Sequence, residues 1–201
     1  MRRRLKKGGF TLIEMLVVIG IIGVLMGALM GAYGFVQKMA WQTQAQTLVS
    51  DAATALALYL NKEGEWPEEI ANGNGEFDED VCLVLQKYNL LEITAYKKND
   101  KGEWVINENS PDRYGLLDPW GRRKLKGNPN LKGDEITKHR LQLRVDTDGD
   151  GKIDGPGIIP QGATIRAPAI VWSRGPSGKD EGNDGQKRYP NENRLSWAFG
   201  K

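Results

Sequence analysis

The sequence predicts an α+β protein in which one long N-terminal helix packs on a small antiparallel sheet. Three patterns support this fold class. The stretch from Met15 to Phe35 contains no charged residue, and apolar residues then recur at helical spacing as far as Leu60. Beyond that point, short segments of alternating apolar and polar residues are separated by turns rich in glycine and proline, which is typical of antiparallel strands.

The uncharged stretch is long enough to cross a membrane. As a helix it extends about 32 Å, close to the ~30 Å hydrocarbon core of a bilayer. A basic leader precedes it, which predicts that this end stays cytoplasmic and that the rest of the chain faces outward. A secretory signal has a shorter apolar core followed by a small-residue cleavage site. Here the small pair Gly8-Gly9 precedes the apolar stretch instead.

Glu14 is a carboxylate at the start of the apolar stretch. At membrane depth an unpartnered charge costs roughly 2.5 to 3.5 kcal/mol, and we expect no partner for it within the helix. Cleavage after Gly9 would create an α-amino group on Phe10 at the same depth in every subunit. Glu14 of one subunit could then neutralise the amine of the next.

The segment from Lys7 to Ile19 (KGGFTLIEMLVVI) resembles the N-terminal signature of type IV prepilins and pseudopilins. The resemblance implies a pilin-like fold, cleavage after Gly9 by a prepilin peptidase, N-methylation of Phe10 and assembly of the helices into a filament core. It also suggests how the chain is divided. We expect a cleaved leader (1–9), a transmembrane and filament-core helix (10–36), an amphipathic continuation (37–63) and a periplasmic globular head (64–201).

Gly23, Gly27 and Gly31 follow one another at four-residue spacing in the apolar stretch. Such a small-residue stripe lets another helix approach closely, and it could also be a place where the helix bends during assembly. Glycine is common in membrane helices, however, so the spacing can also arise by chance. We interpret the stripe as a candidate assembly surface.

The elements after the anchor are predicted from periodicity and turn residues. Gly64 and Pro67 predict that the first helix ends near Lys62 or Glu63. A shorter helix is expected over Phe77–Leu91, and Asp118–Gly121 has the composition of a tight turn that resembles one in the major pseudopilin of type II secretion. The expected strands are Glu103–Asn107, Arg122–Lys126, His139–Asp146, Thr164–Ser173 (interrupted by Pro168) and Arg194–Phe199.

One loop has the composition of a calcium site. Carboxylates occupy positions 1, 3, 5 and 9, glycine occupies position 6, and position 7 offers a backbone carbonyl. Position 12 is glycine rather than glutamate and no helix pattern flanks the loop, so we do not expect a full EF-hand. Calcium would relieve the carboxylate repulsion, whereas the alternative is an acidic, solvated turn. The candidate ligands are Asp146, Asp148, Asp150, Lys152 and Asp154, with Asp180, Glu181 or Asp184 as possible additions.

Several classes of function have little support in the sequence. Five of the 28 basic residues lie in the leader, so the processed chain has a net charge of −3 and no nucleic-acid footprint is expected. Cys82 is the only cysteine, which excludes an intramolecular disulfide. Gly175–Lys179 lacks phosphate-loop spacing, and no nucleophile elbow accompanies His139, so we do not expect an enzyme.

The resemblance implies a pseudopilin, closest to the major subunit of the type II secretion system, because that family holds its C-terminal loops with calcium rather than a disulfide. The expected partners are further copies of the chain, minor pseudopilins, a prepilin peptidase and an assembly platform in the inner membrane. A single membrane pass would place the head in the periplasm. The main alternative is a pilin or minor pilin of a type IV pilus or DNA-uptake filament, and another is a membrane-anchored, calcium-binding adhesion domain.

Overall fold

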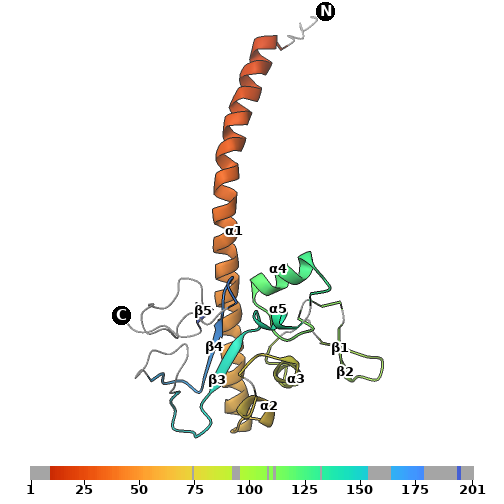
Figure 1. Cartoon of the computed structure of the whole chain (residues 1–201), viewed down its shortest axis with the longest axis vertical. Coiled ribbons are helices and arrows are strands. Elements are labelled where there is room, and N and C mark those ends of the chain that lie inside the picture. The colour runs from red at the N-terminus through yellow and green to blue at the C-terminus, as the bar shows by residue number, and fades with distance from the viewer. Residues whose placement is uncertain are drawn as a thin grey trace, which may run out of the picture. The chain divides into compact units, whose positions relative to one another are not determined.

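The computed structural model describes residues 10–73, 75–91, 96–107, 109–110, 112–131, 133–153, 164–178 and 194–195. The chain divides into two compact units, residues 1–40 and 41–201, and each is considered separately. Figure 1 labels the elements, which are α1 (Leu12–Glu63), α2 (Glu68–Ala71), α3 (Glu79–Lys87), β1 (Tyr96–Lys98), β2 (Trp104–Ile106), α4 (Pro119–Gly127), α5 (Asp134–Thr137), β3 (Gln142–Val145), β4 (Ala169–Ser173) and β5 (Arg194–Leu195).

The described part of the first unit is the N-terminal portion of α1. Its apolar side chains are exposed all round the helix, and none of the most apolar window is buried against other parts of the chain. By length and composition α1 can cross a membrane, as the sequence predicts. Because so large an apolar surface is not stable in water, lipid or other subunits have to cover it.

From Trp41 onward α1 belongs to the second unit, where one of its faces is buried. The buried side chains fall at the predicted helical spacing and include Val49, Leu56 and Tyr59. The helix ends at Glu63, as predicted. Gly64 follows with a φ of 82°, a left-handed conformation that glycine adopts without strain, and its N–H donates to the carbonyl of Leu60 at 2.8 Å.

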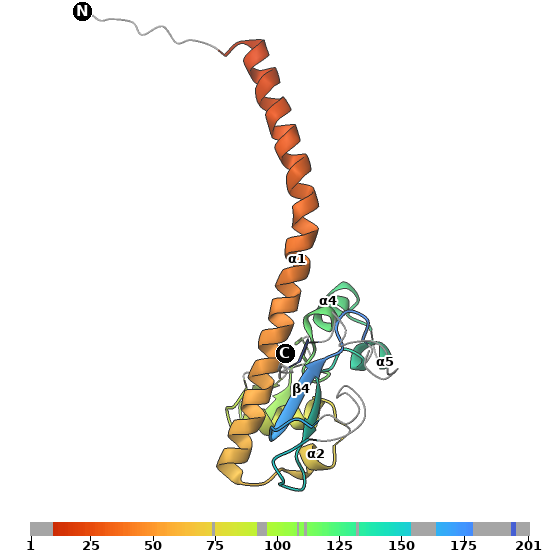
Figure 2. The same cartoon turned by 90° about the vertical axis from the view of Figure 1, so that its left-hand side faces the viewer.

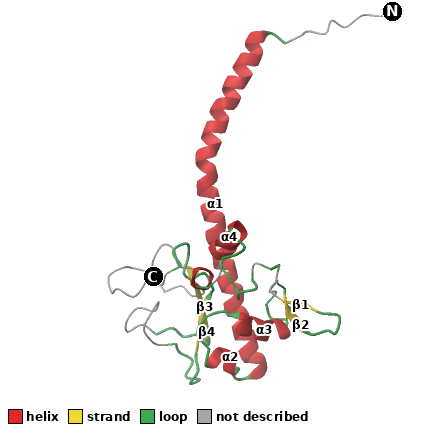
Figure 3. Cartoon of the chain, turned by 45° about the vertical axis from the view of Figure 1, so that its right-hand side comes forward, coloured by secondary structure: helices red, strands yellow, loops and turns green. Residues whose placement is uncertain are grey.

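The main core of the second unit surrounds this face of α1. Helix α3 and the sheet formed by β3 and β4 both pack against it, and Figures 2 and 3 show these elements grouped around the helix. Both alanines and larger apolar side chains of α1 contribute to this core. The buried cluster contains Val49, Ala52, Ala55, Leu56, Tyr59, Ile70, Phe77, Val81, Cys82, Leu85, Leu116, Leu141, Leu143, Ala169 and Val171.

The described strands pair antiparallel, as predicted, but they form two sheets rather than the single sheet expected. In the larger one, β3 pairs with β4 and β4 pairs with β5, so that Leu143 lies opposite Val171. The stretch from Gly75 to Phe77 runs along the other side of β3, since the N–H of Leu143 donates to Gly75 and the N–H of Phe77 donates to Leu141, both at 2.8 Å. Strands β1 and β2 form a separate hairpin.

The prediction of a strand over Arg122–Lys126 is wrong, because these residues belong to helix α4. Asp118 caps the helix, and its Oδ1 accepts the N–H of Gly121 at 2.8 Å, while Pro119 occupies the first turn. Gly121 and Leu125 are then buried four positions apart, which is a helical rather than a strand period. The expected turn at Asp118–Gly121 is therefore the start of a helix.

The other predicted elements are present but shorter. Helix α3 begins at Glu79 rather than at Phe77, because Asp78 caps it by accepting the N–H of Val81 at 3.1 Å. Strand β4 begins at Ala169, directly after Pro168, which lacks an N–H for the ladder. The expected strand from Arg194 is described only as Arg194–Leu195, and the remainder lies outside the described residues.

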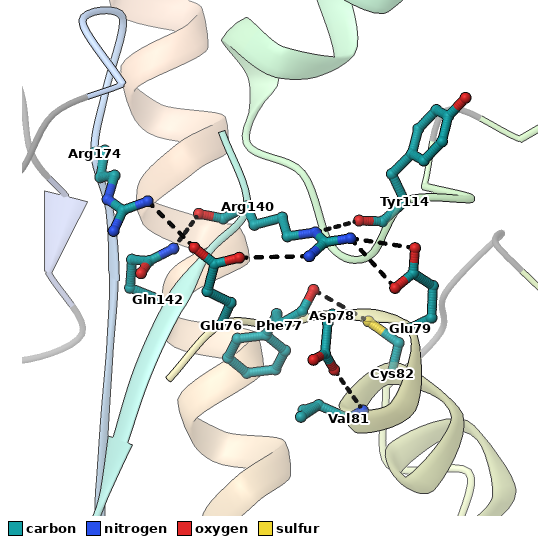
Figure 4. A network of polar contacts seen from close by, with 10 residues as sticks. All are labelled: Glu76, Phe77, Asp78, Glu79, Val81, Cys82, Tyr114, Arg140, Gln142 and Arg174. Carbon is teal, nitrogen blue, oxygen red and sulfur yellow. Dashed lines mark hydrogen bonds and ion pairs between the residues drawn. The ribbon is translucent and has the colours of Figure 1, made fainter. Parts of the chain in front are cut away.

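A network of charged groups joins segments that are distant in sequence (Figure 4). The Arg140 guanidinium donates to Glu76 at 3.4 Å, to both carboxylate oxygens of Glu79 at 3.2 Å, and to the backbone carbonyl of Tyr114. Arg174 donates to the other oxygen of Glu76 at 3.4 Å. Arg140 therefore ties the start of α3 to the residues before β3, and Glu76 extends the link to the residue after β4.

We predict that Arg140→Ala destabilises the second unit by about 2–3 kcal/mol, because it removes a charged donor shared by Glu76, Glu79 and the carbonyl of Tyr114. Urea unfolding of a fragment that begins at Trp41 measures the change. Lys97→Ala is the matched control, since Lys97 is an exposed cation in the hairpin and its loss should change stability by less than about 0.5 kcal/mol. Equal stabilities for the two variants would contradict a central role for the network.

Candidate functional site

The N-terminal end of α1 holds the residues predicted to act in processing and assembly. Thr11 caps the helix, and both its backbone N–H and its hydroxyl donate to Oε2 of Glu14 at 2.8 Å. In return, the N–H of Glu14 donates to Oγ1 of Thr11 at 3.3 Å. This reciprocal arrangement is a capping box, in which a threonine and a glutamate three residues later satisfy donors that the helix leaves unpaired.

Thr11 thus gives the Glu14 carboxylate two neutral hydrogen-bond donors, although it does not neutralise the charge. The Thr-x-x-Glu spacing in the sequence is the usual signal for a capping box, and it identifies Thr11 as a functional residue that the sequence analysis missed. Both Thr11 donors bind Oε2, and among the described residues Oε1 accepts no hydrogen bond. One oxygen of the carboxylate is thus held in place while the other can accept from a second molecule.

The remaining N-terminal candidates are placed only in part. Phe10 is 76% exposed at the start of the described chain, whereas Gly8 and Gly9 lie outside the described residues. A side chain built at Gly23, Gly27 or Gly31 would meet no atom within 4 Å apart from the adjoining helix turns. The glycine stripe therefore remains a prediction about contacts with other subunits.

The acidic loop brings three of the predicted calcium ligands together. Carboxylate oxygens of Asp146, Asp148 and Asp150 lie within 4.8 Å of one another. Calcium binds oxygen at about 2.3–2.6 Å, so a single ion can contact all three groups. Asp146 also organises the loop, since its two oxygens accept the N–H groups of Gly149 at 2.8 Å and Gly151 at 2.7 Å. The donor set and spacing therefore fit a hard cation.

The pKa of Asp146 lies below its ordinary value. Desolvation by itself raises this pKa, but the hydrogen bonds from Gly151, Asp148 and Gly149 favour the charged form and outweigh it. Asp146 consequently stays ionised at a lower pH than an ordinary aspartate does, and the ionised carboxylate is the form that binds a metal ion.

Of the other proposed calcium ligands, the structure describes only Lys152. The Lys152 ammonium lies 3.2 Å from Oδ2 of Asp150, so in this structure it neutralises a carboxylate that calcium would share. Asp154, Asp180, Glu181 and Asp184 lie outside the described residues.

Trp66 contacts the acidic loop, and sequence reasoning did not identify this residue. Its indole N–H donates to the backbone carbonyl of Asp146 at 2.7 Å, across 80 positions of sequence. Its ring lies 6.5 Å from the ring of Tyr59 in a stacked arrangement. The first residue of the loop is therefore attached to the end of α1, and no local pattern could have indicated this.

A buried cluster around His139 resembles a catalytic triad only in composition. Asp118, His139 and Ser173 are all fully buried, and the hydroxyl of Ser173 donates to Asp118 at 2.9 Å. Nδ1 of His139 lies 3.3 Å from Asp118, but neither ring nitrogen makes a hydrogen bond among the described residues. Since the acid lies between the other two groups, the serine has no base to activate it. The cluster joins α4 to β4.

Cys82 is buried in the main core, as expected. Its Sγ lies 3.8 Å from the carbonyl of Phe77, and burial raises the pKa of the thiol far above its ordinary value. A thiol that is protonated and shielded from solvent does not react readily. Cys82 therefore acts as a small core side chain.

Comparison with known proteins places these features in one family. The prokaryotic N-terminal methylation motif matches residues 4–30. A fimbrial protein of Neisseria meningitidis serogroup A is 37% identical over 155 residues, which cover 72% of this chain and 86% of the relative. The type IV major pilin proteins PilE and PilE1 of Neisseria gonorrhoeae are 34% and 28% identical, over 73% and 72% of this chain and 87% and 78% of those proteins. No solved structure matches the chain.

These relatives are structural pilins, and the matched motif covers the capped helix end and most of the apolar stretch. The observed long apolar helix with small antiparallel sheets agrees with an α+β pilin fold. On this evidence the chain belongs to the type IV pilin-like family.

Proposed function

We propose that this protein is a pilin of a type IV pilus, which polymerises through α1 after cleavage behind Gly9. The similarity to major pilins over most of the chain carries this proposal. It replaces the expectation of a type II secretion pseudopilin as the preferred function, since that expectation depended on the turn at Asp118–Gly121 and on calcium. The turn is the start of a helix, and the relatives reported above are pilins.

The N-terminal geometry supports assembly through charge neutralisation. The capping box with Thr11 holds the Glu14 carboxylate at the helix end and leaves Oε1 available. The cleaved and methylated amine of Phe10 from another subunit would pair with that oxygen during assembly. We infer that the subunit waits in the inner membrane with its second unit in the periplasm, and that a prepilin peptidase and an assembly platform act on it there.

A type II secretion pseudopilin is the second candidate, and the acidic loop favours it. Three clustered carboxylates that fit calcium, together with a lone buried cysteine, suggest an ion as the staple for the C-terminal region. In this candidate function the partners include minor pseudopilins and secreted cargo. Calcium binding itself is compatible with either filament.

We predict that long filaments sheared from the cell surface contain this chain, and that its mass corresponds to a terminus at N-methylated Phe10. Mass spectrometry of the isolated filaments measures the terminus, and electron microscopy of a deletion strain tests whether those filaments depend on the chain. An intact Met1 terminus would contradict processing. Loss of protein secretion without loss of surface filaments would instead support the pseudopilin.

Two substitutions of Glu14 separate its charge from its capping role. Glu14→Ala removes both, whereas Glu14→Gln keeps an oxygen that can accept from Thr11 and so preserves the capping box. We predict that both variants insert in the membrane and are cleaved normally but do not assemble, because neither can neutralise the amine. The measurements are the N-terminal mass and the yield of sheared filaments. Normal filaments from Glu14→Gln would show that capping, not charge, is required.

For the acidic loop, we predict that chelation lowers the melting temperature of the fragment that begins at Trp41. With calcium about a hundredfold above its dissociation constant, the expected stabilisation of about 2.7 kcal/mol corresponds to a shift of about 5–10 °C. Asp148→Ala should abolish the shift, while Asp134→Ala, an exposed acid on α5, should retain it. An unchanged melting temperature on adding calcium to metal-free protein would refute the site.

A further inference from the structure

Helix α4 presents a basic surface to solvent. It contains four cations and no acidic residue. Gly121 and Leu125 form its buried side, and Arg122 is neutralised by Asp112, whose Oδ1 lies 2.8 Å from its Nε. The exposed side carries the remaining cations, Arg123, Lys124 and Lys126, which we call the basic face.

The basic face is not neutralised by nearby acids. Among the described residues, the ammonium groups of Lys124 and Lys126 make no ion pair. The neighbouring helix α5 carries Asp134 and Glu135, both exposed, and Glu135 lies 3.8 Å from Lys138. Three cations thus remain together on one helix, in a processed chain whose net charge is −3.

Trp41 connects the basic face to the start of the second unit. The guanidinium carbon of Arg123 lies 4.4 Å from the centre of the Trp41 ring, a cation–π contact. Trp41 follows Gln37, where the uncharged stretch ends, by few residues, which span about 6 Å as a helix and at most about 14 Å when extended. Tryptophan is enriched in the layer where a membrane meets water. The chain itself therefore keeps Arg123 close to that layer.

We propose that the basic face binds the headgroups of anionic phospholipids in the leaflet from which α1 emerges. The proposal rests on the membrane anchoring proposed above and adds a lipid class and a contact surface. Each Lys or Arg near an anionic surface increases association about fivefold. The attraction acts only within about 8–10 Å at moderate salt, so it requires the proximity that Trp41 provides. The contact would orient the second unit of an unassembled subunit at the membrane.

A nucleic acid is a less suitable partner for this surface. Proteins that bind duplex DNA through its backbone typically neutralise about 6–10 phosphates. The basic face offers three cations on a chain of negative net charge. A lipid headgroup needs fewer contacts, because the anchored subunit is already tethered beside it, so three cations suffice.

The test uses the full processed chain with a fluorophore on Gly127→Cys. A Cβ at Gly127 would meet nothing within 4 Å, and the buried thiol of Cys82 is protected from the label. The chain is reconstituted in vesicles of phosphatidylcholine, with or without phosphatidylglycerol, that contain a lipid with a nitroxide on its headgroup. Quenching of the fluorophore measures its contact with the headgroups.

We expect quenching to increase about fivefold or more when phosphatidylglycerol is present, and to be lost at high salt. The Lys124→Gln/Lys126→Gln variant, which keeps Arg123, should lose most of this increase. The matched Lys97→Gln/Lys101→Gln variant removes two exposed cations from the β1–β2 hairpin and should have no effect.

Three results would overturn the proposal. Flotation of the vesicles shows whether the chain is anchored in them. If the anchored chain is quenched equally with and without phosphatidylglycerol, the basic face does not bind anionic lipid, although membrane anchoring stands. An equal loss in the hairpin variant shows that only net charge matters. A DNA gel shift that requires Lys124 and Lys126, without any lipid effect, reassigns the surface to nucleic acid. Failure of the chain to float refutes the anchoring itself.

Discussion

The second unit depends on one buried face of α1. Ala45, Ala52 and Ala55 are buried on this face, and Leu56 and Tyr59 extend the buried surface toward the end of the helix. Helix α3 and the β3–β4 sheet share a core with this face, whereas Leu117, Leu125 and Ile136 form a separate buried cluster. A bulky or charged side chain in the middle of it would separate layers that share a single core, since packed interiors tolerate little change in volume.

Polar contacts between distant segments supplement this core where a small domain often uses a disulfide. Arg140 joins α3 to the residues before β3, and Glu76 connects it to Arg174 after β4. On the other side, the buried Asp118 both caps α4 and accepts from Ser173 at the end of β4. Each link binds a loop or a helix end to the sheet.

The two candidate sites share a physical principle. At the N-terminus, Thr11 fixes one oxygen of Glu14, and in the acidic loop, backbone N–H groups fix both oxygens of Asp146. Local hydrogen bonds thus orient each carboxylate before any partner arrives, which lowers the entropy that binding has to overcome. The basic face of α4 differs, because long flexible side chains carry its cations and respond to charge rather than to shape.

The sequence by itself determined the apolar helix, its buried face, its end at Gly64, the antiparallel sheet and the three carboxylates of the loop. These features follow from periodicity, turn residues and ligand spacing, which are local properties. It also contained the Thr11–Glu14 capping box, although the sequence analysis did not use that signal. Only the tertiary structure decided that Arg122–Lys126 is helical, since burial of Gly121 against His139 and of Leu125 with Leu117 and Ile136 selects the helical period. Three further contacts likewise depend on the fold, because each joins residues that only long-range packing brings together. They are the contacts of Arg140 with Glu79, of Trp66 with Asp146 and of Arg123 with Trp41.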